Sequence, residues 1–221
     1  MKRIFIVLAT ALALALAGST AARAGGEPRA GIYALRGLPG AQLDYRSLWL
    51  AVDHGLVTGW FDNPSTAPAA NNPDRDPTCR FLMTGRPDEH GRLDFTTGFA
   101  GERGGHIVMQ RDAGGAWTVQ ALGDLPNCDV PTIAVGDTLS LGEARDWRGF
   151  VTVASPRAPL YSAPRVQAVT RAWLVKGDVA AVLAREGDWL RIDYFSGGGE
   201  LLRWIRRADL RADLRADLRA D

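Results

Sequence analysis

Few side chains in this 221-residue sequence could carry out chemistry on a substrate. His54, His90 and His106 are its whole stock of neutral-pH bases. His54 and His90 fall in expected turns, where an exposed polar residue is the ordinary case, and His106 opens an expected strand. Asp88 and Glu89 form an acidic pair that is more typical of a solvated turn than of a catalytic site. Because nucleophile elbows, zinc motifs and phosphate-binding loops are absent from the sequence as well, we expect no catalytic activity.

The two cysteines, Cys79 and Cys128, favour a structural role. Two thiols in an exported chain most often form one disulfide, because the compartment beyond the inner membrane is oxidising. A metal site shared with the histidines is the alternative, but neither C-x-x-C nor H-x-x-x-H spacing is present. A catalytic thiol would need an adjacent base, and none is visible. We expect a Cys79–Cys128 disulfide, no metal and no cofactor.

The first residues predict export. Lys2 and Arg3 precede an apolar run over residues 4–17, and Ala22–Ala24 has the small residues of a cleavage site. The run is shorter than the roughly 20 residues that span a bilayer. We therefore expect residues 1–24 to be a signal peptide and the mature protein to be periplasmic or secreted, without a membrane span.

The charge of the mature chain argues against a nucleic-acid partner. Cleavage removes Lys2, Arg3 and Arg23 from the 26 basic residues, which leaves 23 basic against 25 acidic residues. Binding to a phosphate backbone depends on a basic stripe or patch, and the balanced charge provides none.

Residues 30–149 have the pattern of an antiparallel β domain. Apolar residues alternate with others through 48–52 and 93–99, as in strands with one buried face. Short strands joined by turns predict an up-and-down barrel or a sandwich. Residues 137–148 are either a last strand or a short helical connector. Further strands are expected at 31–33, 56–61, 79–84, 106–111 and 117–122, with turns at 53–55, 88–91 and 113–115.

One connection in this domain is long. Residues 62–78 are rich in Pro, Asn and Asp and show no strand pattern. The spacing Asn72-x-Asp74-x-Asp76 is that of a calcium loop, but Pro77 and Met83 stand where such a loop needs Gly and Glu. We expect a mobile rim loop that Cys79 ties at its end.

Residues 150–210 carry the motifs of a known family. They contain L-Y at 160–161, L-V-K-G-D at 174–178, G-D-W-L-R-I at 187–192 and W-I-R-R-A-D-L at 204–210. This series resembles the bacterial SH3-like domain and implies a small SH3-like barrel. No Pro/Ser-rich tether precedes it, so we expect the two domains to pack against each other.

The resemblance also implies a binding surface between the first two loops of the domain. Tyr161 and Trp189 match the family's positions most expected to face that surface, and Trp173, Tyr194 and Trp204 are weaker candidates. The alternative is that these rings fill the small core of a 60-residue barrel. The sequence departs from the family pattern at Arg203, where a Gly usually stands, and in a Gly-rich insert at 197–199.

The end of the chain repeats R-A-D-L. In a helix, residues 211–221 would place like charges four residues apart, which is unfavourable. We expect a frayed tail without a function of its own.

Three functions fit these features. The first is an exported envelope binding protein that docks on peptidoglycan or a wall-associated protein through residues 150–210, as the resemblance implies. The second is a periplasmic inhibitor or immunity protein that blocks a cell-wall hydrolase with residues 62–78. The third is a small-molecule carrier that uses the interior of the first barrel.

Overall fold

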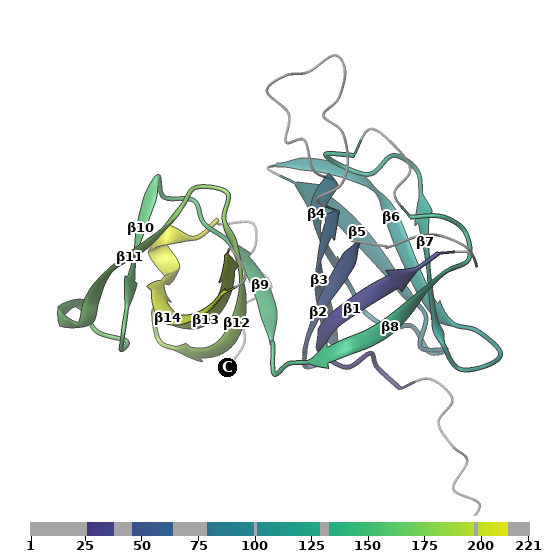
Figure 1. The fold of residues 1–221 in the computed structure, drawn as a ribbon, viewed down its shortest axis with the longest axis horizontal. Coiled ribbons are helices and arrows are strands. Elements are labelled where there is room, and N and C mark those ends of the chain that lie inside the picture. Colours follow the sequence, from purple (N-terminus) through teal and green to yellow (C-terminus); the bar gives the residue numbers. More distant parts are fainter. Residues whose placement is uncertain are drawn as a thin grey trace, which may run out of the picture.

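The computed structural model of the chain describes residues 26–37, 46–63, 79–99, 101–128, 133–196 and 199–211. The described residues form two β units side by side (Figure 1), and their only helices are single 3-10 turns, η1 (Val166–Ala168) and η2 (Arg207–Asp209). The all-β prediction is therefore confirmed. The expected signal peptide, residues 64–78 of the expected loop and the tail beyond Arg211 lie outside the described residues.

The first unit is a closed barrel of eight antiparallel strands, each paired with the next one along the chain. The last strand closes the barrel against the first, with Leu35 opposite Leu139. Closure leaves none of the eight strands with an unpaired edge. Gly31 permits the approach of these two strands, because a side chain there would collide with the carbonyl oxygen of Glu143. The strands are β1 (Gly31–Arg36), β2 (Ser47–Asp53), β3 (Leu56–Asn63), β4 (Cys79–Gly85), β5 (Leu93–Phe99), β6 (Glu102–Arg111), β7 (Trp117–Leu122) and β8 (Asp137–Ala144).

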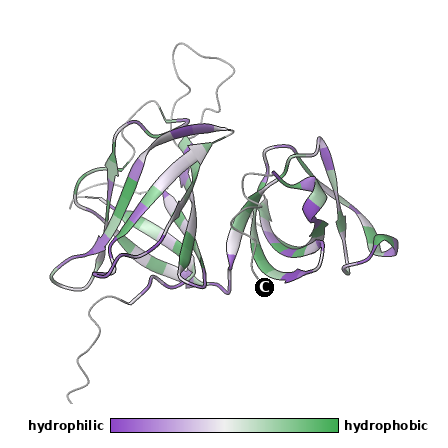
Figure 2. Ribbon diagram, turned by 180° about the vertical axis from the view of Figure 1, so that it is seen from behind, coloured by the Kyte–Doolittle hydropathy of each residue, from purple (hydrophilic) through white to green (hydrophobic). Residues whose placement is uncertain are grey.

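Hydrophobic and hydrophilic residues alternate along the barrel strands (Figure 2). In β5, Leu93 and Phe95 are buried, whereas Asp94 between them is exposed. The interior side chains pack as one core, in which the rings of Phe61 and Phe81 stack with their centroids 4.9 Å apart. The barrel interior is thus occupied by the chain's own side chains.

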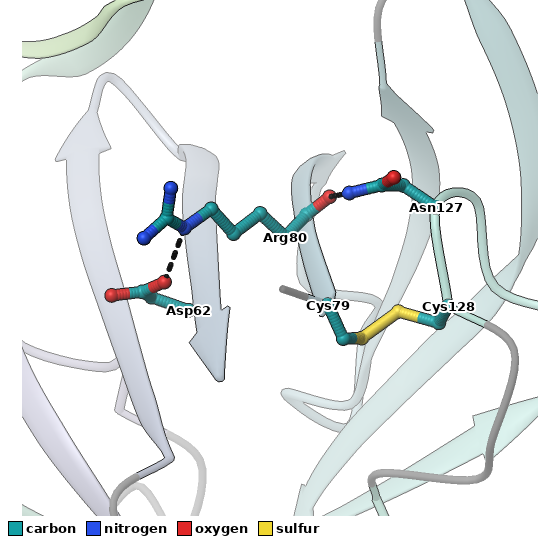
Figure 3. Close-up of a disulfide and its surroundings, with 5 residues drawn as sticks. All are labelled: Asp62, Cys79, Arg80, Asn127 and Cys128. Atoms are coloured by element: carbon teal, nitrogen blue, oxygen red, sulfur yellow. Dashed lines mark hydrogen bonds and ion pairs between the residues drawn. A yellow bond between two sulfur atoms is a disulfide. The ribbon is translucent and has the colours of Figure 1, made fainter. Parts of the chain in front are cut away.

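The structure defines two barrel segments more closely than the sequence did, residues 137–148 and the strand that begins at Leu56. The segment 137–148, left open between strand and helix, contains β8, which pairs with both β1 and β7. The strand expected at 56–61 extends to Asn63, two residues farther. Asp62 lies opposite Arg80 in the ladder, and the Arg80 guanidinium donates to its carboxylate at 2.7 Å (Figure 3). This cross-strand ion pair favours the longer strand.

The second unit is a six-stranded antiparallel sheet in the order β11-β10-β14-β13-β12-β9. The sequence predicts turns at 176–178 and 186–188, and the structure has turns at 176–177 and 187–188 that join strands of this sheet. Leu160, Leu190 and Ile205 belong to a core of its own, separate from that of the barrel. The strands are β9 (Gly149–Thr152), β10 (Arg157–Tyr161), β11 (Val169–Val175), β12 (Val179–Glu186), β13 (Trp189–Ser196) and β14 (Gly199–Arg206).

An apolar cluster joins the two units where β9 follows β8 after four residues (Figure 1). Trp147 of this connection is only 1% exposed. Its ring stacks on Trp49 of β2 and meets the edge of Phe195 of β13, with centroids 5.7 Å apart in both pairs. Phe150 of β9 packs against the same ring. The units therefore pack directly on each other, as the missing tether predicted.

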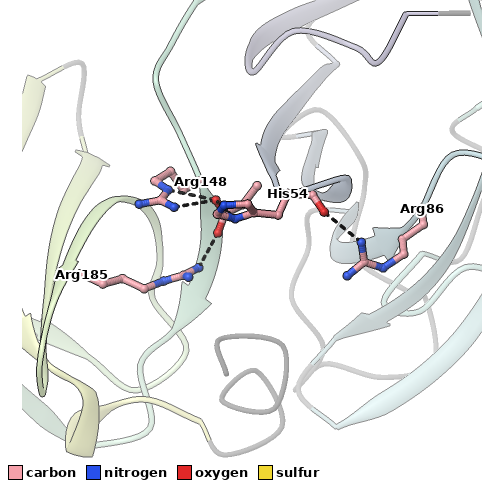
Figure 4. Close-up of polar contacts among 5 residues, drawn as sticks. His54, Arg86, Arg148 and Arg185 are labelled. Carbon is pink, nitrogen blue, oxygen red and sulfur yellow. Dashed lines mark hydrogen bonds and ion pairs between the residues drawn. The ribbon is translucent and has the colours of Figure 1, made fainter. Parts of the chain in front are cut away.

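An ion-pair cluster around Asp53, the last residue of β2, also holds the junction together. The guanidinium of Arg148 donates to its carboxylate at 2.8 Å, and Arg185 of β12 lies 3.2 Å from the same group. His54 Nδ1 is 3.1 Å from this carboxylate. Figure 4 shows His54 between the arginines of the second unit and Arg86, which donates to the His54 backbone carbonyl. His54 is therefore a part of the junction.

Asp193 of β13 is a buried charge at this junction, with 2% of its surface exposed. One carboxylate oxygen accepts a hydrogen bond from Trp147 Nε1 at 2.9 Å and lies 3.8 Å from Arg145. The other oxygen has no hydrogen-bond partner among the described residues. Burial raises the pKa of the Asp193 carboxyl, and the bond from Trp147 offsets this only in part.

Candidate ligand-binding groove

Three of the five predicted ligand-binding residues lie on one face of the second sheet. Strand register places Tyr161 of β10 opposite Trp204 of β14, which in turn lies opposite Arg191 of β13. Two residues along these strands, Trp189 lies opposite Arg206. Because side chains two residues apart share a face, all of these side chains lie on the side opposite the core. The core side is lined by Leu190, Ile192 and Ile205.

Tyr161 and Trp189 contact each other directly. Their rings meet edge to face, with centroids 4.7 Å apart and planes at 82°, a geometry that aromatic quadrupoles favour. The guanidinium carbon of Arg206 lies 5.4 Å from the Trp189 ring and 5.9 Å from the Tyr161 ring. Among the described residues Arg206 makes no ion pair. Its charge is thus held against the two rings and remains available to a ligand.

Trp189 and Arg206 border a cleft of about 530 Å³, which we call the Trp189 groove. Tyr161, which is 6% exposed, packs on Trp189 but does not line the cleft, and neither does Trp204. One side comes from η1, where Val166 is 52% exposed. The other side comes from the turn before β13, the end of β14 and η2. The backbone N–H of Arg207 donates to the carbonyl of Asp188 at 2.9 Å and fixes that turn against η2. The lining residues are Val166, Asp188, Trp189, Arg206, Arg207 and Ala208.

The resemblance predicts a binding surface between the first two loops of the domain. One side of the Trp189 groove comes from the loop between β10 and β11, and the other comes from the 187–188 turn together with η2. Trp189 itself, directly after the 187–188 turn, belongs to this second side.

The other two predicted residues lie elsewhere. Trp173 is 48% exposed on β11, the edge strand, where the guanidinium of Arg157 covers its ring at 3.9 Å. Tyr194 of β13 is half-buried and packs against the core of the second unit. Neither lines the Trp189 groove.

Five lining residues were not predicted as binding residues from the sequence: Val166, Asp188, Arg206, Arg207 and Ala208. Arg206 had a usable signal, because it stands two residues after Trp204 in a strand and so shares its face. Val166 had none, since only folding brings its loop beside the turn before β13. The five add apolar side chains and charges of both signs to the predicted ring of Trp189. Such a set can bind a ligand that combines an apolar segment with charged groups.

The remaining histidines and the acidic pair have local contacts. His90 lies 3.4 Å from Glu89 in an exposed turn. Asp88 in that turn accepts hydrogen bonds from the backbone N–H groups of Arg92 and His90, and these bonds lower the pKa of its carboxyl. His106 Nδ1 lies 2.7 Å from Asp94 on the outer face of the barrel. The hydrogen bonds of Asp88 are therefore those of a residue that stabilises a turn.

The predicted disulfide is confirmed and lies away from the Trp189 groove. Cys79, the first residue of β4, is bonded to Cys128 in the segment before β8 (Figure 3). Asn127 donates to the carbonyl of Arg80 at 3.3 Å beside it. This hydrogen bond and the disulfide together fix the beginning of β4 to the segment that leads into β8.

Three further observations bear on function. No cluster of three or more His, Cys, Asp or Glu side chains suited to a metal ion occurs among the described residues. The same part of the chain has no helix with the length and apolar character that crossing a membrane requires. Comparisons of the chain with family models, with curated proteins and with solved structures found no match.

Proposed function

We propose that this chain is an exported binding protein of the cell envelope, without catalytic activity, that docks on the peptides of peptidoglycan through the Trp189 groove. The observation that carries the proposal is the Tyr161–Trp189 ring pair with the guanidinium of Arg206 beside it. The resemblance of residues 150–210 to the bacterial SH3-like domain points to the same class of ligand. The disulfide fits a protein of an oxidising compartment.

The chemistry of the groove suits such peptides. Rigid aromatic rings provide contact area for an extended peptide at low entropic cost. Arg206 can bind a carboxylate with two parallel hydrogen bonds, and Asp188 in the same groove can bind an amino group. The short peptides of peptidoglycan carry both groups on a small apolar backbone. The charged groups of the groove thus support the proposal, because each has an opposite charge to pair with on such a peptide.

Co-sedimentation with purified sacculi tests the proposal. The chain without its expected signal peptide should pellet with sacculi, and Trp189→Ala should remain in the supernatant. Arg206→Gln, which keeps the size of the side chain but removes the charge, should weaken pelleting by about tenfold, as expected for a lost hydrogen bond to a charged group. Trp173→Ala is the matched control, because it removes the same ring from an exposed position outside the groove.

The controls separate binding from folding. Trp189 packs on Tyr161, so its variant is first compared with the wild type by circular dichroism and thermal unfolding. Arg206→Gln tests the groove with little risk to the fold. If no version pellets, or if Trp173→Ala loses pelleting while Trp189→Ala keeps it, the proposal is wrong.

A second candidate function, inhibition of a cell-wall hydrolase, is favoured by one observation on the barrel. Asn63 and Cys79 lie opposite each other in the ladder, so the connection between β3 and β4 leaves and re-enters the barrel at one point. The disulfide to Cys128 anchors that point. An inhibitor would slow digestion of sacculi by one hydrolase and lose this effect when residues 64–77 are replaced by a short Gly/Ser linker.

A further inference from the structure

A row of hydroxyl groups crosses the outer face of the barrel. Register places Thr58 of β3 opposite Thr84 of β4, Thr84 opposite Thr96 of β5, and Thr96 opposite His106 of β6. Their neighbours Val57, Met83, Phe95 and Ile107 are in the core, so the row faces outward. Adjacent strands are about 4.8 Å apart, which sets the spacing of the polar groups in the row.

This row is one wall of a second cleft, of about 440 Å³, at the junction of the two units. Phe150 and Thr152 of β9 line the cleft together with the row. Phe150 is buried and Thr152 is 8% exposed. We call this site the threonine cleft, defined by Thr58, Thr84, Thr96, His106, Phe150 and Thr152. Clefts between packed units are common places for small ligands.

Most of the hydrogen-bonding groups that line the threonine cleft are neutral hydroxyl groups. Thr58 Oγ1 is buried and has no hydrogen-bond partner among the described residues, a situation that is unfavourable unless a ligand or water pairs it. When His106 Nδ1 donates its proton to Asp94, 2.7 Å away, Nε2 remains as an acceptor. Arg103, Arg211 and Glu102 also line the cleft, an excess of one positive charge, and they add further donors and acceptors to the row.

We infer that the threonine cleft binds a short saccharide through its row of hydroxyl groups. A pyranose ring has hydroxyls around its rim and apolar C–H faces, and both have partners here. The Thr84 and Thr96 hydroxyls and His106 can bond the rim, whereas Leu82 and Phe99, which also line the cleft and are partly exposed, provide apolar surface for a face. The inference uses none of the residues of the Trp189 groove. It holds or fails independently of the peptidoglycan proposal.

Titration calorimetry with three trisaccharides tests the inference. Chitotriose, cellotriose and maltotriose are titrated into the chain that begins at Gly25, and inorganic phosphate serves as the anionic probe. At least one trisaccharide should bind. The double variant Thr84→Val/Thr96→Val, which keeps side-chain shape and strand propensity, should weaken that binding by about tenfold.

The chain provides a matched control. The Thr118 hydroxyl of β7 donates to the backbone carbonyl of Gln110 at 3.1 Å, and the Thr96 hydroxyl donates to the backbone carbonyl of Thr84 at 3.3 Å. Thr118 does not line the cleft. Thr118→Val should leave saccharide affinity unchanged. The inference is overturned if no trisaccharide binds, if phosphate binds instead, or if the double variant and Thr118→Val bind equally well.

Discussion

The barrel and the six-stranded sheet deal with strand edges in different ways. In the barrel, pairing of β8 with β1 removes the edges altogether. The sheet keeps two edges. One of them, β9, is packed on the barrel through Phe150 and the adjoining Trp147. The other, β11, exposes Val169, Trp173 and Val175.

This difference indicates which unit depends on the other. The barrel has a closed ladder, a core of its own and a disulfide. The sheet has a smaller core and gains part of its buried surface only at the junction, where Ala181 of β12 is buried beside Phe150. Damage to the junction should therefore weaken the sheet, whereas damage to the disulfide should weaken the barrel.

The largest effect is expected from Trp147→Ala. The change leaves a cavity between the units and should lower the free energy of unfolding of the sheet by about 3–5 kcal/mol. Trp173→Ala, the matched change at the exposed edge, should cost no more than about 1 kcal/mol, mainly from the lost stacking on Arg157. Hydrogen exchange read segment by segment measures both. Similar losses in the two variants would mean that the junction does not support the sheet.

The next effect concerns the barrel. Replacing both Cys79 and Cys128 by Ser opens a loop between residues 49 positions apart, which should lower the stability of the barrel by about 3 kcal/mol. Denaturant unfolding followed by hydrogen exchange in β4 and β8 measures the loss. Protection in β13 and β14 should stay as in the wild type. A loss there of the same size would show that the two units unfold as one.

The smallest effect is the pH dependence of the junction. Because burial raises the pKa of Asp193 in the folded state, the folded chain holds this proton more tightly than the unfolded chain does. The favourable contribution is complete below the unfolded pKa and disappears as pH rises through the folded pKa. Asp193→Asn, which can still accept from Trp147, should be more stable than the wild type at pH 7, by on the order of 1 kcal/mol.

Urea unfolding of both proteins from pH 7 down to pH 4 measures this difference, which should shrink as pH falls. A difference that grows on acidification would mean that the ion pair with Arg145 outweighs the cost of burying the carboxylate.

Local patterns in the sequence predicted much of the fold. The alternation around Leu93 and Phe95 marked a strand with one buried face, and the predicted turn at Gly187–Asp188 joins β12 to β13. The two cysteines indicated their disulfide because the export that the first residues predict would place both thiols in an oxidising compartment. Each of these predictions depends on neighbouring residues or on composition.

Features that depend on distant pairing were not predicted. Trp147 stands among charged residues in the sequence, and its burial arises only when Trp49 and Phe195 meet it from the two units. Thr58, Thr84 and Thr96 form a row only through strand register. Tyr194 carried a binding prediction from its strand motif, but the alternation from Leu190 and Ile192 turns it toward the core.

The short connection between β8 and β9 has a mechanical consequence. If the sheet is anchored to the cell wall, any pull on the barrel passes through residues 145–148, since this is the covalent path between the two units. Trp147 and Arg148 in that path are fastened to both sides, by ring contacts and by the Asp53 ion pair. The force is therefore distributed over several contacts and does not act on a flexible linker. Under tension, the two units should move together.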